Sequence, residues 1–179
     1  MFGRRRRKPP ANLRPRLDRD ERTLAWARVA ERADQAVVVT TLGVWLPGRS
    51  ERLGWHQIHK ATWSASRLTV VPSRAVGDGV GEDGSPYTVM VDDTPIVLAL
   101  ADPGEVPPTV RERVTKSVAH TAHHPLPVGG VRVVGRRVAG RNGLVWHVRY
   151  DDGTDVADTA VQAATAELVA DAAHPHQPE

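Results

Sequence analysis

A succession of short segments rich in β-branched and aromatic residues constrains the fold of this chain most strongly. The segments read QAVVVTT at residues 35–41, GVWLP at 43–47, RLTVVP at 67–72, YTVMVDD at 87–93 and PIVLALA at 95–101. Segments of this kind, bounded by turn-forming residues, are typical of β-strands. We expect Pro72 to end the third strand, residues 75–86 to form a glycine-rich acidic loop, and the last two strands to pair as a hairpin around residues 92–94. These residues therefore predict a mostly antiparallel sheet.

Two stretches are ambiguous from their residues alone. Residues 22–30 contain enough alanine for a helix, while Leu24 and Trp26 also allow a strand. In RLGWHQIHKATW, at residues 52–63, an alternating pattern slips between Trp55 and Ile58, which indicates a bulge or one tight turn. Gly43 is a candidate for a bulge inside one long strand that joins QAVVVTT to GVWLP.

The pattern changes from strand to helix after residue 106. Residues 107–124 place Val110, Val114, Val118 and Ala122 four apart, which predicts an amphipathic helix with prolines near its start. Two more strands, at residues 131–139 and 143–150, flank a Gly-Arg-Asn-Gly turn, and Asp158 or Thr159 is placed to cap a last helix. The predicted fold class is α+β: an antiparallel barrel or sandwich capped by one amphipathic helix, followed by a ββα extension.

The charge of the chain is concentrated near its beginning. The net charge is +3, from 24 basic and 21 acidic residues, and residues 1–17 hold seven basic residues and no acidic one. The remaining 17 basic residues are therefore outnumbered by the 21 acids, so the rest of the chain is acidic by count. We expect residues 1–17 to form a disordered basic arm and residues 174–179 a disordered tail. The chain has no cysteine and its basic start lacks an apolar run, so we expect neither disulfides nor a signal peptide.

The order of several short motifs resembles the bacterial pleckstrin-homology-like (PH-like) domains. Those motifs are an acidic residue, a VVVT segment, a GVWL segment, a W-x-x-I kink and a short L-x-V strand. Here they correspond to Glu21, residues 37–40, residues 43–46, Trp55 with Ile58, and Leu68 with Val70. The resemblance covers residues 21–72, and the hairpin and helix through about residue 124 fit the remaining parts of that fold, which implies a PH-like domain at residues 18–124. The ββα extension predicted at residues 125–173 is not part of the family pattern. It also implies that residues 22–30 form a strand and that Trp55, Ile58 and Trp63 lie in or near the core.

Several motifs resemble known binding sites, but the residues around them argue against binding. GVGEDG at residues 79–84 has dinucleotide-binding spacing, but two acids and a following strand oppose phosphate binding, so we expect a loop. His56, His59, His120, His123 and His124 match no zinc-site spacing, and we expect solvated histidines, with His120 and His123 on the exposed side of the helix. YDDGTD at residues 150–155 lacks the glutamate of a calcium loop and indicates a turn. We therefore expect no catalytic residues, no cofactor and no metal, and the chain is not expected to be an enzyme.

The basic arm is the feature with a direct physical consequence. Its candidate anionic-surface residues are Arg4, Arg5, Arg6, Arg7 and Lys8. Each contributes about 1 kcal/mol near an anionic leaflet, and the same charges would release counterions from DNA or RNA. Our hypothesis is a non-catalytic cytoplasmic interaction module, recruited by the arm to an anionic surface, with the inner membrane face as first choice. A nucleic-acid- or nucleoprotein-associated factor is the alternative, and a protein partner and the oligomeric state stay open.

Overall fold

The computed structural model of the chain describes residues 8–176, which fall into two compact units. Of these residues, the first unit comprises 8–72 and 93–115, and the second comprises 73–92 and 116–176. In the first unit the elements are η1 (Ala11–Leu13), β1 (Thr23–Val29), β2 (Arg32–Thr40), β3 (Gly43–Trp45), β4 (Leu53–Gly54), η2 (Trp55–Gln57), β5 (Ile58–Ser64), the start of β6 (Arg67–Val80), β8 (Ile96–Ala101) and most of α1 (Val106–Ser117).

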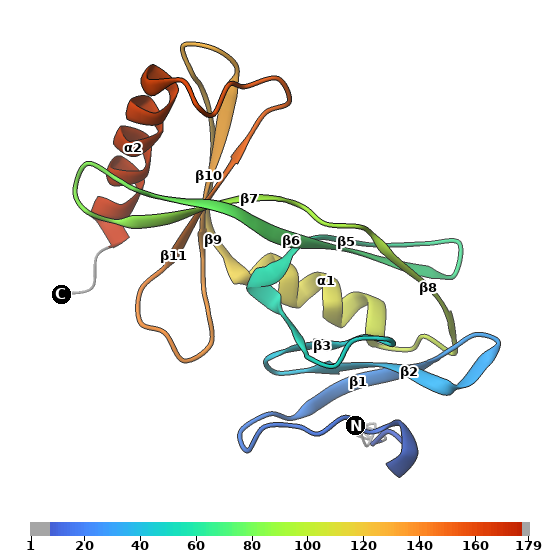
Figure 1. The fold of residues 1–179 in the computed structure, drawn as a ribbon. Helices are drawn as coiled ribbons and strands as arrows, with labels where there is room; N and C mark the ends of the chain where they lie inside the picture. The colour runs from blue at the N-terminus through green and yellow to red at the C-terminus, as the bar shows by residue number, and fades with distance from the viewer. Residues whose placement is uncertain (1–7, 177–179) are drawn as a thin grey trace. The chain divides into compact units, whose positions relative to one another are not determined.

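The first unit is an antiparallel sheet with one helix after its last strand. Its strands follow the order β4-β3-β2-β1-β8-β6-β5, and each neighbouring pair is antiparallel. Figure 1 shows α1 between the strands β1–β3 and the strands β5, β6 and β8. This arrangement confirms the expected antiparallel architecture with a helix against it. It also confirms the strand interpretation of residues 22–30.

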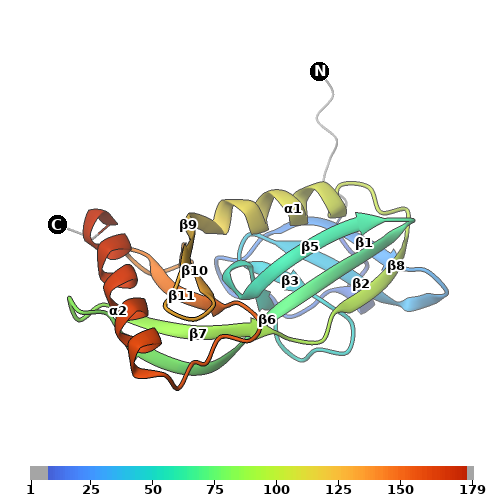
Figure 2. The same ribbon diagram turned by 90° about the horizontal axis from the view of Figure 1, so that it is seen from above.

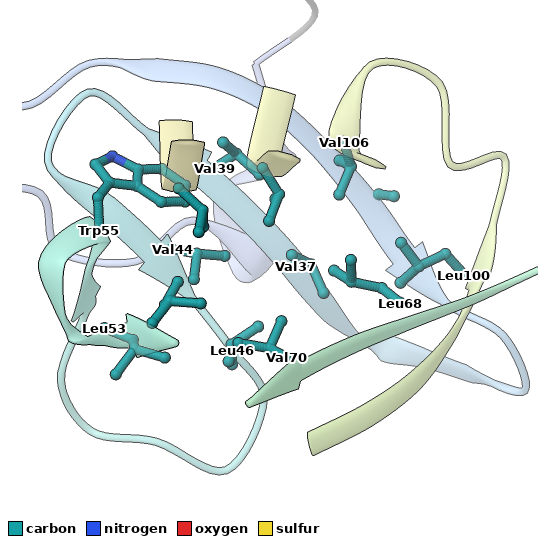
Figure 3. Close-up of a cluster of buried hydrophobic side chains, with 14 residues drawn as sticks. Val37, Val39, Val44, Leu46, Leu53, Trp55, Leu68, Val70, Leu100 and Val106 are labelled. Atoms are coloured by element: carbon teal, nitrogen blue, oxygen red, sulfur yellow. The ribbon is translucent and has the colours of Figure 1, made fainter. Parts of the chain in front are cut away.

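The core of this unit joins both parts of the sheet to α1, as Figure 3 shows. Val37 and Val39 of β2 point into it, as do Leu68 and Val70 of β6. The helix contributes Val106, Val110 and Val114, which lie one turn apart on one face. The four-residue spacing seen in the sequence therefore identified the correct face of α1.

The second unit is built on its own sheet. It contains residues 73–80 of β6, β7 (Pro86–Asp92), β9 (Val118–Pro125), β10 (Gly130–Arg136), β11 (Val145–Tyr150), α2 (Thr159–Ala173) and η3 (His174–His176). The strand order is β6-β7-β11-β10-β9, antiparallel except for the parallel pair β7–β11. The helix α2 packs on one face, where Val169 and Ala173 meet Tyr87, Trp146 and the valines of β10 and β11. Figure 2 shows α2 beside these strands.

The division into two units differs from the expected boundary at residue 124. Residues 73–92 supply β7 and half of β6 to the sheet that carries the predicted ββα segment, because Tyr87, Thr88 and Val89 pair with β11. The segment at 125–173 is therefore not a separate extension. Asp158 does cap α2, as expected, by accepting from the backbone nitrogens of Ala160 and Val161.

The expected loop at residues 75–86 and the expected stop at Pro72 are wrong. β6 continues through Pro72 to Val80, and only residues 81–85 form the turn. Pro72 is the last residue of β6 that pairs with β5, and Ser73 is the first that pairs with β7. A residue without an N–H group is tolerated where a strand exchanges partners. β7 and β8 do not form the expected hairpin, because both pair with β6: β8 with its first residues, 67–70, and β7 with residues 73–80.

The expected helix at residues 107–124 ends at Ser117. Residues 118–125 form β9, which pairs with β10 along its length. Val118 and Thr121 are β-branched, and pairing with β10 satisfies their backbone groups better than an exposed helix end would. His120, His123 and His124 consequently lie on a strand. Gly43 likewise begins the separate strand β3 rather than a bulge, since Val39 pairs with Val44 across a turn.

The ambiguous stretch at residues 52–63 contains the predicted tight turn. Trp55 to Gln57 form the single 3-10 turn η2, which lets Trp55 and Ile58 both reach the core. The burial of these two side chains confirms that expectation. Trp63 differs: its side chain is 38% exposed, so the expectation that it is a core residue is wrong. It lies next to the end of β5, which has a neighbouring strand on one side only among the described residues.

Candidate functional site

The described part of the basic arm is packed against the first unit. Pro9 and Leu13 are buried, and the Nη2 of Arg14 donates to the carbonyl oxygen of Pro9 at 2.9 Å. Residues 8–17 therefore have a defined path, which contradicts the expectation that all of residues 1–17 are disordered. Lys8 is exposed at the beginning of this path, whereas Arg4, Arg5, Arg6 and Arg7 lie outside the described residues.

The packed arm explains why three successive valines of β2 are buried. Val37 and Val39 face the core, and Val38 must point to the opposite face of the sheet. Val38 is nevertheless only 1% exposed, because it lies under the arm and beside Trp45. A strand buried on both faces reads as a continuous apolar run, which is what this segment shows.

A shallow, open hollow of about 300 Å³ lies between the arm and the strands below it, and we call it the arm hollow. Its lining comes from three segments: Asn12, Leu13, Arg14 and Pro15; Asp34, Gln35, Ala36 and Val38; and Trp45, Leu46, Pro47, Gly48 and Arg49. Arg14 and Arg49 are exposed basic residues on its walls, and Asp34 is the acidic residue among them. The hollow thus brings one guanidinium group from outside the arm, that of Arg49, to the same place as Arg14 of the arm.

Sequence reasoning missed Arg49. It follows the GVWLP segment in a turn and is separated from Arg14 by 34 intervening residues, so no local pattern links the two. The pairing of β2 with β3 and the path of the arm bring them to the same hollow. A prediction of the arm packing on β2 would have been needed to find this pair.

A buried carboxylate fixes the point at which the arm enters the sheet. Glu21 Oε1 accepts hydrogen bonds from Thr40 Oγ1 at 2.5 Å and from Trp45 Nε1 at 3.0 Å. Its Oε2 accepts from Arg52 Nη1 at 2.7 Å and from the backbone nitrogen of Asp18 at 3.1 Å. The side chain of Glu21 is 0% exposed, so its charge has lost its contact with water. The four donors compensate for that loss.

Arg52 links this carboxylate to the surface. Its Nη1 also contacts Asp18 Oδ2 at 2.9 Å. Burial acts to lower the pKa of Arg52, but the hydrogen bond to Asp18 and the charge of Glu21 outweigh it and raise the pKa above its ordinary value. Arg52 is therefore held as a cation beside the arm. The negative charges of its two carboxylate partners offset the charge of Arg52, so Arg52 attracts an added anion less strongly than Arg14 or Arg49 does.

The second unit has a larger hollow of about 590 Å³. It is lined by residues of the β6–β7 hairpin, by the loop before β11, and by Trp146 and Ala173. Thr88 donates to Asp78 Oδ1 at 2.9 Å on its wall, and Arg141 lies in the loop. Burial and the neighbouring Tyr150 raise the pKa of Tyr87, another lining residue. The hollow is thus lined by two aromatic rings, those of Tyr87 and Trp146, and by one acidic and one basic side chain, those of Asp78 and Arg141. This lining favours no single class of ligand.

Basic residues on the sheet of the second unit are engaged with neighbours. Arg149 Nη1 contacts Asp92 Oδ1 at 2.5 Å and its Nη2 donates to Ser73 Oγ. Arg136 is buried and donates to Ser117 Oγ at 2.7 Å. Burial, and then the positive charge of Arg149, lower the pKa of Arg136 to about 10. These side chains hold the sheet together, so we do not assign them to a binding site.

The histidines of β9 have individual environments. His120 is half-buried and meets the ring of Trp146 edge-on at 5.5 Å, which contradicts the expectation that it is solvated. His123 is exposed and contacts Asp151 Oδ2 at 2.8 Å. Within residues 8–176 no three His, Asp or Glu side chains are grouped so that they could hold a metal ion.

The GVGEDG and YDDGTD motifs, for which the sequence predicted no binding role, lie at or next to turns. Residues 81–85 of the GVGEDG region form the tip between β6 and β7, with a left-handed Gly84, and Gly153 takes a left-handed conformation in the turn after β11. The turn expected for YDDGTD is therefore confirmed. For GVGEDG only residues 81–84 belong to a turn, because Gly79 and Val80 are still part of β6.

Comparisons with family models, curated proteins and solved structures find no match to this chain. In the part of the chain that the structure describes, no helix is both long enough and apolar enough to span a membrane.

Proposed function

We propose that this chain is a non-catalytic interaction module whose first unit is a PH-like domain. The proposal is supported by an antiparallel sheet that is closed by one amphipathic helix after its last strand, as the resemblance implies. Glu21, Thr40 and Trp45 belong to three of the motifs that carry the resemblance, and they meet at one hydrogen-bonded carboxylate. That meeting gives the motifs a shared structural role.

We propose further that the basic arm recruits the chain to an anionic surface, with the inner face of the cytoplasmic membrane as first choice. The observation that carries this proposal is the arm hollow, where Arg14 of the arm and Arg49 of the turn after β3 are both exposed on the folded surface. Lys8 and Arg16 are also exposed along the same segment. Basic side chains held together need not be ordered by the partner, so their attraction to an anionic leaflet is opposed by a smaller entropy cost.

Neutralising variants test which residues carry the affinity. Arg4, Arg5, Arg6, Arg7 and Lys8 are changed to glutamine together, which leaves the buried Pro9 and Leu13 in place. A matched control changes five exposed basic residues outside the arm: Lys60, Arg67, Arg74, Arg111 and Arg141. Both variants lose the same charge, so a difference between them reports the position of the charge. Co-sedimentation with vesicles of anionic phospholipid measures the affinity of each.

We expect the arm variant to lose at least about tenfold in affinity, since each basic residue contributes about 1 kcal/mol near an anionic leaflet. The control should change by less than about threefold, because its charges are distributed over the acidic body. Arg14→Gln with Arg49→Gln should weaken binding further in the arm variant. Equal losses in the arm and control variants would show that general charge, and not the arm, governs association.

Duplex DNA provides the second arm of the experiment. The same basic residues would release counterions from a nucleic acid, so the alternative function predicts that DNA is bound more tightly than vesicles near physiological salt. We expect vesicles to be bound more tightly. The opposite order would support the nucleic-acid-associated factor and reject membrane recruitment.

A further inference from the structure

The charged residues on the walls of the arm hollow leave a single net positive charge. Three of the lining residues are charged: Arg14 and Arg49 are basic, and Asp34 is acidic, so the walls carry a net charge of +1. All three residues are exposed. They come from the arm, from the start of β2 and from the turn after β3, so the fold of the first unit brings them together.

The uncharged lining residues add polar and apolar groups to these charges. Asn12 and Gln35 carry side-chain amides, which can donate hydrogen bonds to an oxygen atom. Trp45 and Pro47 are half-buried, so part of their apolar surface is in contact with solvent. A molecule that matches this lining has one negative charge, oxygen atoms that accept hydrogen bonds, and an apolar part.

We propose that the arm hollow binds the phosphodiester of one phospholipid headgroup, and that Asp34 makes it discriminate against phosphates of higher charge. This inference rests on the proposed recruitment to an anionic membrane and names the lipid chemistry that the hollow recognises. Guanidinium groups bind phosphate oxygens through paired hydrogen bonds. A phosphodiester carries one negative charge, as each phosphate of DNA does, whereas a phosphomonoester carries about 1.5–2 at pH 7.

The shape and the lining of the hollow favour a lipid over a nucleic acid. The hollow is shallow and open, so a headgroup that stays attached to a leaflet can enter it. A DNA backbone offers the same diester but no long apolar chain to lie against Trp45 and Pro47. The two arginines can offset both the carboxylate of Asp34 and one phosphate charge, but a second phosphate charge would be repelled by Asp34.

Vesicles of equal surface charge separate the contribution of the hollow from that of the arm. One set contains phosphatidylglycerol, a diester, and the other contains phosphatidic acid, a monoester, each mixed with phosphatidylcholine to the same zeta potential. The attraction of the arm depends on the surface potential and is therefore the same for both sets. The ratio of the two affinities, which we call the lipid preference, then reports on the hollow.

We expect the unchanged protein to prefer phosphatidylglycerol by about threefold, the size of one charge interaction at a protein surface. Asp34→Asn should abolish or reverse this preference, because the repelling carboxylate is gone. Arg14→Gln with Arg49→Gln should abolish it as well. Glu167→Gln, at an exposed glutamate of α2, removes the same charge as Asp34→Asn and should keep the preference. Circular dichroism and thermal melting verify that each variant folds.

Soluble glycerophosphoglycerol, the headgroup of phosphatidylglycerol without its acyl chains, distinguishes a lipid from a free phosphodiester. We expect it to bind at least about tenfold more weakly than the same headgroup in vesicles, where the arm also holds the protein at the surface. Tighter binding of the soluble compound would overturn the proposal. A loss of duplex DNA binding without a loss of vesicle binding, when Arg14 and Arg49 are changed, would overturn it in favour of a nucleic acid.

The same measurements distinguish this inference from the recruitment on which it rests. If the unchanged protein binds anionic vesicles and Asp34→Asn leaves the lipid preference intact, the role of the hollow is overturned while recruitment by the arm stands. If the unchanged protein binds neither set of anionic vesicles, both are overturned.

Discussion

The indole nitrogen of Trp45 donates a 3.0 Å hydrogen bond to the carboxylate of Glu21, whose side chain is completely buried. Thr40 and Arg52 donate to the same carboxylate. Four parts of the chain therefore meet at one charged group: the residues before β1, the end of β2, β3 and the loop before β4. This carboxylate orients the arm relative to the strands that it covers.

Glu21→Ala should destabilise the protein by about 2–4 kcal/mol. It leaves donors without an acceptor and removes the closest carboxylate partner of a partly buried arginine. Trp45→Phe keeps the ring and loses only the N–H donor, so it should cost about 1 kcal/mol. Urea unfolding measures both changes. Glu51→Ala, at an exposed glutamate, is the control and should stay within about 0.5 kcal/mol of the unchanged protein. Equal effects of Glu21→Ala and Glu51→Ala would contradict the structural role of Glu21.

Ile58→Ala should cost more stability than Trp63→Ala, although tryptophan is the larger residue. Ile58 is 0% exposed in the core, and removing its side chain should cost about 2–5 kcal/mol. Trp63 is 38% exposed and should cost about 1–2 kcal/mol. Chemical denaturation of the two variants decides the order. A larger loss for Trp63→Ala would mean that its ring is packed in solution.

Leu13→Ala should lower stability by about 1–2 kcal/mol, because Leu13 anchors the arm over Val38. Asn12→Ala, at the exposed neighbouring position, should have almost no effect. Removal of residues 1–16 should lower the melting temperature, since it takes away Leu13 and Pro9 and uncovers β2. An unchanged melting temperature after this truncation would show that the arm does not pack in solution.

The two tyrosines of the chain provide a spectroscopic prediction for the second unit. The pKa of Tyr87 is raised by burial and then by Tyr150, so its neutral form is favoured in the fold. A raised pKa means that this stabilisation is complete below the unfolded value near 10 and is lost as pH rises through the folded value. In absorbance titration at the tyrosinate band, Tyr87→Phe should remove a component that titrates above pH 10. Loss of a component with an ordinary midpoint would contradict the burial of Tyr87.

Local patterns predicted the elements whose partners are close in the sequence. The valine spacing identified the core face of α1, the slip between Trp55 and Ile58 identified the tight turn, and Asp158 caps α2. The length of a strand is different, because it depends on which strand lies beside it. β6 continues past Pro72 because β7 is there to pair with it, and β9 forms because β10 offers a full-length partner.

The candidate site was predictable only in part for the same reason. A run of basic residues is visible in any sequence, and it identified the arm. The packing of Leu13 on β2 and the proximity of Arg14 to Arg49 depend on contacts between distant residues. The three successive valines at 37–39 were a usable signal in the sequence, since a continuous apolar run is typical of a strand that is covered on both faces.

Binding of the unchanged full chain to vesicles, measured as a function of salt, tests the proposed recruitment most directly. We expect binding to vesicles of anionic phospholipid and none to neutral vesicles, with affinity falling steeply between about 50 and 200 mM salt because the attraction is electrostatic. Absence of binding to anionic vesicles at about 50 mM salt, where screening is weak, would contradict the account. Equal binding to anionic and neutral vesicles would contradict it as well.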